Sequence, residues 1–198
     1  MIYENTPTLE TERLILRKFA VKDTAPMLEL LSDAETNTFL PWFPLKTESA
    51  AQDFLTRRFI VHYTAQSAYR YAVCLKENGR AIGYVCLSDD ESHDFGYGLK
   101  KEFWHKGIMA EASAAVVQRI GYAGYPYITA THDINNPRSG AVMKKLGMLY
   151  QYSYVEQWQP KNFPVTFRMY QLNFDDNSYP AYVGYWNLYP DHFVEENV

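Results

Sequence analysis

The stretch WHKGIMAEA, residues 104–112, decides how this chain of 198 residues is interpreted. It follows an apolar run that ends near Leu99, and it precedes a helix that the spacing of apolar residues predicts over 107–122. Three lysines lie in or beside the turn: Lys100, Lys101 and Lys106. A helix start leaves its first N–H groups without intrahelical partners and carries partial positive charge. The stretch therefore predicts a phosphate-binding site, although a tight turn at Gly107 with solvated lysines explains the same residues.

A second stretch, NNPRSGAVMKKLGM at 135–148, predicts a complete short helix. Asn136 before Pro137 is typical of an N-cap followed by the first helical position, and Gly147 is typical of the C-terminal stop. Ser139 falls on the same stripe as the apolar residues, so its hydroxyl is expected to point inward. It either bonds a local backbone group, as Ser commonly does in a first turn, or faces a bound ligand.

Around these two stretches, predicted strands and helices succeed one another in a mixed order. The strands are expected over 9–19, 69–76, 81–88, 94–99, 126–132, 149–158 and 164–174. The helices are expected from an N-cap at Asp23 through Leu31, from Thr47 as far as Tyr63, over 107–122, and from Pro137 to Leu146. This order predicts an α/β fold, with helices packed on a partly antiparallel sheet.

WHKGIMAEA after a strand, followed by NPRSGAVMKKLGM, resembles the acetyl-CoA-binding core of the Gcn5-related N-acetyltransferase (GNAT) superfamily. The opening TERLILR is similar to the branch that includes the ribosomal-protein alanine N-acetyltransferases (RimJ/RimL-like), and the resemblance covers residues 9 to 174. It implies a mixed, mostly antiparallel central sheet of about seven strands with four helices. The fourth and fifth strands, here 94–99 and 126–132, would splay apart to admit acetyl-CoA.

The same resemblance implies which residues hold acetyl-CoA. In the family, a Gln/Arg-x-x-Gly-x-Gly/Ala stretch wraps the pyrophosphate with backbone N–H groups, and the matching positions are Trp104, Gly107 and Met109. Met109 departs from the small residue usual at its position, and Asn136 would bind the pantetheine amide region. The full expected set is Leu99, Trp104, His105, Lys106, Gly107, Ile108, Met109, Asn136 and Ser139.

The resemblance further implies direct acetyl transfer to a neutral amine in a ternary complex. The family position that often holds a Tyr proton donor is Met143 here, so Ser139 becomes the expected donor to the leaving thiolate. Deprotonating the amine requires a base within hydrogen-bond reach, directly or through water. Glu156 and His132 are the candidates and Asp94 is a third. The alternatives are that Glu156 is an exposed strand residue and His132 an ordinary strand-end residue.

The acceptor is left open between a protein N-terminus and a small-molecule amine. Trp42 and Phe43 lie in a region that usually shapes the acceptor cleft of the family. An acidic cluster either attracts a cationic amine or forms a solvated loop: Asp89, Asp90, Glu91 and Asp94. The alternative to an enzyme is a CoA-binding or assembly module whose catalysis has decayed.

Composition narrows the possible partners. With 19 Lys and Arg, 23 Asp and Glu and a net charge of −4, the chain is no basic nucleic-acid binder. No run approaches the roughly 18 apolar residues of a membrane span, and no signal-peptide core is present at the N-terminus. The five histidines show no ligand spacing with cysteines or acids, so we expect no metal, no nucleic acid and no membrane.

Cys74 and Cys86 flank an Asn-Gly pair, the strongest short signal for a hairpin. A two-residue loop at 78–79 would place Cys74 opposite Gly83 and Cys86 opposite Tyr71, so we expect no disulfide. Two buried thiols favour a reducing compartment, and the sequence therefore predicts a cytoplasmic protein.

The expected domain spans residues 1–174, and residues 175–198 form an acidic aromatic extension. This extension carries five acidic residues and no Lys or Arg. Its many aromatic residues argue against a free solvated tail. It is expected either to fold back over its own sheet or to cross to a second subunit and build a homodimer.

Overall fold

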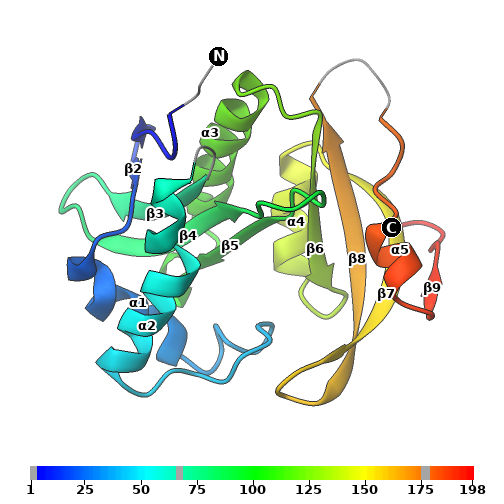
Figure 1. Ribbon diagram of the computed structural model, residues 1–198, viewed down its shortest axis with the longest axis horizontal. Coiled ribbons are helices and arrows are strands. Elements are labelled where there is room, and N and C mark those ends of the chain that lie inside the picture. Colours follow the sequence, from blue (N-terminus) through cyan, green and yellow to red (C-terminus); the bar gives the residue numbers. More distant parts are fainter. Residues whose placement is uncertain (1–3, 66–68, 175–178) are drawn as a thin grey trace.

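The computed structural model describes residues 4–65, 69–174 and 179–198, and within these ranges the chain forms two β-sheets flanked by helices (Figure 1). The first sheet has the order β1-β2-β3-β4-β5 and the second the order β6-β8-β7-β9. Neighbouring strands within both sheets run antiparallel. The expected mixed, mostly antiparallel α/β fold is confirmed.

The first sheet is covered by helices on both faces (Figure 1). Its strands are β1 (Leu9–Glu10), β2 (Leu14–Arg17), β3 (Arg70–Leu75), β4 (Ala81–Leu87) and β5 (Phe95–Leu99). The helices are α1 (Thr24–Ser32), α2 (Glu48–Arg58) and α3 (Ile108–Tyr122), with 3-10 turns at Val21–Asp23, Ile60–Thr64 and Lys101–Phe103. Successive strand residues point to opposite faces, so Val73 packs in the cluster under α3 while Ala72 and Cys74 pack in the cluster under α1 and α2.

The strand expected over 9–19 is broken in two. Between β1 and β2 the Thr11 N–H donates to the Leu14 carbonyl at 3.0 Å, which forms a turn. The turn lets Arg13 reach α3, where its Nε donates to a Glu111 carboxylate oxygen at 2.6 Å. The helix that begins after Thr47 is also shorter than expected, because its last turn gives way to the 3-10 turn at Ile60–Thr64.

The hairpin between β3 and β4 has a longer loop than the Asn-Gly pair predicts. A two-residue type I′ turn needs a positive φ at both central residues, but only Gly79 has one, at 68°, and Asn78 does not. The Leu75 N–H donates to the Arg80 carbonyl at 3.1 Å and closes the longer loop.

The longer loop changes the register of both cysteines, and a further shift occurs between Val73 and Cys74. The expected register was therefore wrong. The observed pairs are Cys74 with Ala81 and Cys86 with Arg70, in place of Gly83 and Tyr71. Both thiols are free, as expected.

The second sheet diverges from the first (Figure 1). Its strands are β6 (Tyr127–Asp133), β7 (Leu149–Trp158), β8 (Phe163–Asn173) and β9 (His192–Phe193), and α4 (Pro137–Lys145) follows β6. Among the described residues, the pairing between β5 and β6 is confined to an isolated parallel bridge of Asp94 with Thr129. Beyond this bridge the two strands separate, as the resemblance implied for the fourth and fifth strands.

The C-terminal segment lies on its own sheet. Helix α5 (Gly184–Leu188) places aromatic side chains against β7 and β8, and β9 pairs with β7. The Tyr189 ring stacks on Tyr154 with centroids 4.8 Å apart. Residues 175–178, where the expected extension begins, lie outside the described residues. Within the described ranges, no helix has the length and apolarity needed to cross a bilayer.

Candidate active site

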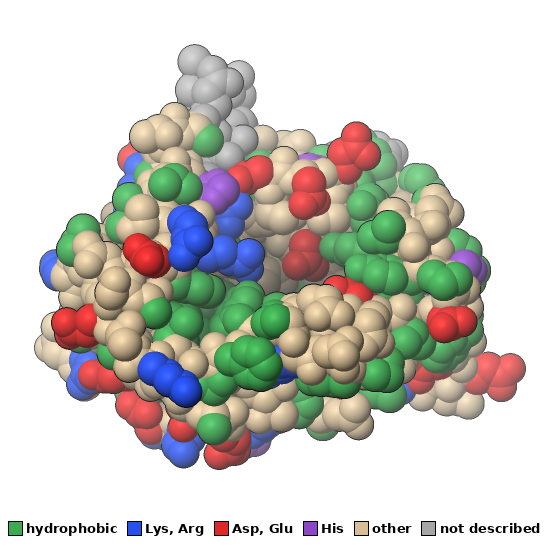
Figure 2. Space-filling view, turned by 60° about the horizontal axis from the view of Figure 1, so that its bottom comes forward, with side chains coloured by type: hydrophobic (Ala, Val, Ile, Leu, Met, Phe, Trp, Pro, Cys, Tyr) green, Lys and Arg blue, Asp and Glu red, His purple; other side chains and the backbone are tan. Residues whose placement is uncertain are grey.

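A cleft of about 590 Å³ opens where β5 and β6 separate. Figure 2 shows the hollow, with basic side chains on one side of it and apolar side chains along its lower edge. We call one end the α3–α4 end, lined by Trp104, Gly107, Asn136 and Ser139. The opposite end, lined by Trp42, Arg58, Tyr84 and Asp94, is the α1–α2 end. All residues expected to hold acetyl-CoA line this cleft except Lys106.

The edge of β5 that faces the cleft offers backbone hydrogen-bonding groups. Ser88 N–H donates to the Asp94 carbonyl and Lys100 N–H to the Ile82 carbonyl, each at 2.9 Å. Alternate residues of an antiparallel strand point their N–H and C=O groups to the same side. The main-chain groups of Tyr97 and Leu99 therefore point away from β4 and toward the cleft, where an extended polar ligand can bond to them.

The turn before α3 has the backbone shape that a phosphate site requires. Gly107 has a φ of 72° and His105 a φ of 60°, both left-handed, so N–H groups are turned outward at the helix start. A Cβ added at Gly107 would meet only Arg13 Nη2, at 3.7 Å, so the space above the glycine is open. Ile108 and Met109 are buried in the core below α3, so the bulk of Met109 is directed into the protein.

Two of the three lysines of this turn belong to other interactions. Lys100 is buried and its Nζ lies 2.5 Å from a Glu29 carboxylate oxygen, while Lys101 Nζ lies 3.3 Å from Asp33. Lys106 is exposed over the Phe103 ring. Of the three lysines that the alternative interpretation takes as solvated, Lys101 and Lys106 are exposed. Lys100 is buried, because Glu29 of α1 supplies an acidic partner that local sequence does not show.

Arg138, which the sequence did not single out, supplies positive charge at the α3–α4 end. Its guanidinium lies 4.1 Å from the centre of the Trp104 ring and lines the cleft. Trp104 in turn donates its indole N–H to the Leu99 carbonyl at 2.8 Å, which fixes the ring. Arg138 lies in the first turn of α4. The motif 135–148 contains this position, so the sequence alone could have identified Arg138 as a candidate.

Ser139 forms a pair with Tyr97, a second residue that the sequence did not single out. The Tyr97 hydroxyl donates to the Ser139 carbonyl at 2.7 Å, and its oxygen lies 3.0 Å from Ser139 Oγ. Because the tyrosine proton is used in the first bond, the serine hydroxyl donates in the second. Burial raises the pKa of Tyr97 well above its usual range. Asn136 caps α4 by accepting the Ser139 N–H at 3.4 Å.

The three candidate bases differ in position. Asp94 lines the cleft, its Oδ1 is inaccessible and has no hydrogen-bond partner in the described part of the chain, and burial raises its pKa to about 7. Glu156 is not among the lining residues; it lies beside the Tyr189 hydroxyl, and burial raises its pKa. His132 lines the cleft, but its Nε2 faces α4, where a Cβ on Gly140 would lie 2.6 Å away.

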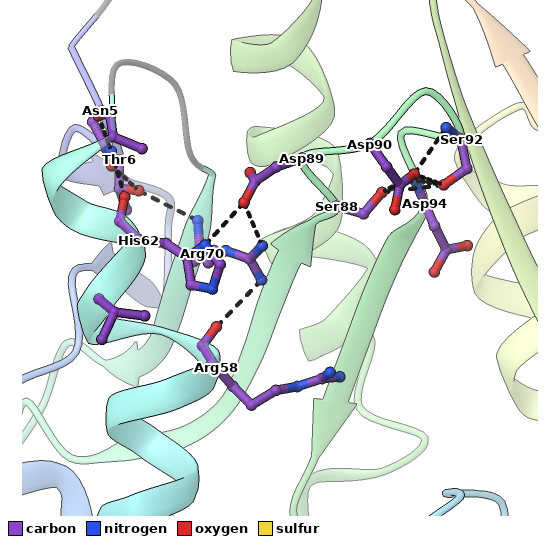
Figure 3. Close-up of polar contacts among 12 residues, drawn as sticks. Asn5, Thr6, Arg58, His62, Arg70, Ser88, Asp89, Asp90, Ser92 and Asp94 are labelled. Atoms are coloured by element: carbon purple, nitrogen blue, oxygen red, sulfur yellow. Dashed lines mark hydrogen bonds and ion pairs between the residues drawn. The ribbon is translucent and has the colours of Figure 1, made fainter.

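The acidic cluster does not act as one surface (Figure 3). Asp89 lies 2.8 Å from Arg70 and 2.9 Å from His62, and Asp90 accepts hydrogen bonds from Ser92. Of the four acids, Asp94 alone lines the cleft within the described chain. Of the cluster that was expected to attract a cationic amine, only Asp94 is therefore placed to do so in the cleft. Trp42 lines the cleft, whereas Phe43 is 58% exposed outside it.

Comparisons with known proteins agree with this geometry. Residues 13–149 match the model of the acetyltransferase (GNAT) domain family. An uncharacterised N-acetyltransferase of Bacillus subtilis (strain 168), YnaD, is 26% identical over 145 residues, which cover 71% of this chain and 81% of YnaD. The uncharacterised N-acetyltransferase p20 of Bacillus licheniformis is 32% identical over 110 residues, 53% of this chain and 61% of p20.

Solved structures share the fold. A GNAT-family acetyltransferase from Bacillus anthracis superposes with a TM-score of 0.74 at 21% identity, covering 85% of this chain and 99% of that one. RimL, a ribosomal L7/L12 α-N-protein acetyltransferase in complex with coenzyme A, has a TM-score of 0.74 at 17% identity. The match covers 86% of this chain and all of RimL.

Proposed function

This chain belongs to the GNAT family of acetyltransferases, and on that premise we propose that it moves an acetyl group from acetyl-CoA to a primary amine by direct attack in a ternary complex. The observation that carries the proposal is the cleft between β5 and β6, with the Tyr97–Ser139 pair on one side and Asp94 at its other end. The alternative is a CoA-binding module whose catalysis has decayed.

The residues present fit acetyl-CoA. Main-chain groups of Tyr97 and Leu99 face the gap, and the start of α3 offers N–H groups under an open Gly107. Arg138, stacked on Trp104, adds a cation beside the phosphates. Bound there, acetyl-CoA supplies an activated thioester. A backbone N–H of β5 would stabilise the negative charge that develops on its carbonyl oxygen.

Asp94 would deprotonate the acceptor amine. A carboxyl whose pKa is about 7 is partly ionised at neutral pH, and in that form it accepts a proton from an amine. Asp94 forms, with Thr129, the bridge at which β5 and β6 begin to separate, so it lies at the end of the gap. We therefore prefer it to Glu156 and His132, which remain candidates.

Ser139 would return a proton to the leaving thiolate. Its hydroxyl donates to Tyr97, and the Tyr97 hydroxyl is the nearest source of a replacement proton. Neither cysteine would act as a nucleophile, because burial raises the pKa of Cys74 and of Cys86 to about 11. The amine nitrogen thus bonds to the acetyl carbon as the carbon–sulfur bond breaks.

The test is thiol release from acetyl-CoA over a panel of primary amines, with acetylated products identified by mass spectrometry. Ser139→Ala is expected to slow turnover by about 10²-fold or more without weakening CoA binding. Ser113→Ala is the matched control, because Ser113 is buried in α3 outside the cleft and its hydroxyl has no partner among described residues. Saturable CoA binding without any acetylated product would establish the decayed module instead. Full-rate turnover by Ser139→Ala would remove the serine from the mechanism.

We also propose residues 1–174 as the catalytic domain, 175–198 as an extension, and the cytoplasm as the compartment. The free thiols of Cys74 and Cys86 support a reducing environment. Exchange of the extension between two subunits stays a proposal, to be tested by sedimentation of the full chain.

A further inference from the structure

Two opposite charges lie at the α1–α2 end of the cleft, and neither forms a salt bridge with another described side chain. Arg58 ends α2, and its guanidinium carbon lies 5.2 Å from the centre of the Trp42 ring and 5.9 Å from that of Phe54. Figure 3 shows the Arg58 side chain extending from α2 over the sheet, in which Asp94 directly precedes β5. The aromatic rings hold the guanidinium in place and leave its hydrogen-bond donors free for a ligand.

The two charges lie at different depths. Arg58 is exposed, whereas Asp94 Oδ1 is inaccessible and lacks a partner within the described ranges. An acceptor that enters from solvent therefore passes Arg58 before it reaches Asp94. The positive charge of Arg58 is close enough to oppose the rise in the pKa of Asp94.

Two glycines of β5 contribute to the floor of this end of the cleft. Gly96 and Gly98 point to the α1–α2 side, the side opposite to Tyr97. A Cβ on Gly98 would lie 2.5 Å from the Tyr84 ring, and one on Gly96 would lie 3.4 Å from Cys86 Sγ. The Tyr84 ring therefore covers Gly98, whereas Gly96 lines the cleft without a side chain of its own.

The walls and a bridging contact limit the size of the acceptor. Trp42, Trp158 and Phe167 line this end with apolar surface. Lys161, in the β7–β8 hairpin, donates from Nζ to the Asn37 carbonyl at 2.7 Å and so joins the hairpin to the segment after α1. The contact holds together two segments that contribute Trp158 and Phe39 to the lining of the cleft. Walls held together in this way favour a small molecule over the surface of a folded protein.

We infer that the acceptor is a free amino acid with an apolar side chain, its amine at Asp94 and its carboxylate at Arg58. The inference rests on the proposed acetyl transfer and names the substrate class of the same site. The amine gives one proton to Asp94 and forms the new carbon–nitrogen bond, and the thiolate released from the thioester takes a proton from Ser139. The carboxylate stays intact and only positions the molecule.

Other amines fit this pair of charges less well. A polyamine would bring a second cation beside Arg58, and like charges at such a distance disfavour binding. A peptide N-terminus has a neutral amide where the amino acid has its carboxylate, so it would leave the guanidinium without a partner. The apolar walls would receive the side chain of the amino acid.

The experiment measures kcat/KM for L-phenylalanine, L-leucine and L-methionine, each compared with its amide and with its decarboxylated amine. We expect kcat/KM to be about tenfold or more higher for the free acids, because their carboxylate forms a charge-assisted hydrogen bond that the amides and amines lack. Arg58→Gln should abolish the preference, because it should raise KM for the free acids by about tenfold more than it raises KM for the decarboxylated amines. Arg57→Gln is the matched control, because Arg57 is exposed on the same helix and does not line the cleft.

A second measurement does not depend on turnover. Calorimetric titration of the protein saturated with CoA should show binding of the free amino acids and loss of that binding in Arg58→Gln. Equal kcat/KM for acids, amides and amines would overturn the amino-acid inference and leave acetyl transfer standing. Acetyl-CoA binding without acetylation of any amine would overturn the proposed function, and absence of amino-acid binding to the CoA complex would then overturn this inference too.

Discussion

Replacing Asp94 with Asn should make the protein more stable at pH 8 and leave its stability nearly unchanged at pH 4. Burial and the charge of Asp90 raise the pKa of this carboxyl from 3.8 to about 7, against the opposing effect of Arg58. The folded chain therefore binds this proton more tightly than the unfolded chain does. As the pH rises from 3.8 to about 7, ionising the buried carboxyl costs the wild type stability that Asn retains. At 1.36 kcal/mol for each pKa unit, Asp94→Asn can raise the free energy of unfolding at pH 8 by about 4 kcal/mol at most.

The measurement is urea denaturation of both proteins at pH 4 and pH 8, with kcat/KM followed over the same range. Asp53→Asn, an exposed carboxyl on α2, is the control and should show no such difference between the two pH values. In the wild type, kcat/KM should rise as the pH increases through about 7, whereas Asp94→Asn should have lost most activity at every pH. An Asn variant that is destabilised equally at pH 4 and pH 8 would show that Asp94 is not a desolvated base.

Three further predictions concern other parts of the molecule. Gly107→Asp should weaken acetyl-CoA binding in calorimetry by about tenfold or more relative to Gly107→Asn. The Asn variant has the same left-handed backbone strain without the charge. Equal affinities would show that the phosphates do not bind at this turn. Arg138→Gln should weaken CoA binding by about tenfold. If Arg138 contacts the 3′-phosphate, the wild type and the variant should bind 3′-dephospho-CoA with equal affinity. Truncation after Phe174 should lower the melting temperature because it uncovers the aromatic face of β7, including Tyr154; an unchanged melting temperature would contradict the observed packing.

Local sequence patterns predicted those parts of the fold that depend on local interactions. Asn136 before Pro137 predicted the start of α4, and the Asn136 side chain does accept the Ser139 N–H. The helix after Gly107 was predicted from a regular apolar stripe over 107–122, and the structure begins it at Ile108. These features need only neighbours within a few residues, so the sequence carries them in full.

The parts that were missed depend on partners far along the chain. Lys100 could be recognised as buried only with knowledge of Glu29, which lies 71 residues earlier. Tyr97 and Ser139 are separated by 42 residues, and no periodicity indicates that their hydroxyls meet. The hairpin register failed for a different reason, because the loop is longer than two residues and a bulge between Val73 and Cys74 shifts the pairing again.

The parting of β5 from β6 has a consequence for the proposed cosubstrate. Beyond the bridge of Asp94 with Thr129, the facing strand edges have main-chain groups that no other described strand pairs. An extended ligand bonded to both edges would replace a missing strand and join two sheets into one continuous surface. Acetyl-CoA would then be part of the architecture as well as a reactant, and each tenfold rise in its concentration above the dissociation constant would add about 1.4 kcal/mol to the stability of the fold. The amount of folded protein in a cell would thus follow the supply of the acetyl donor.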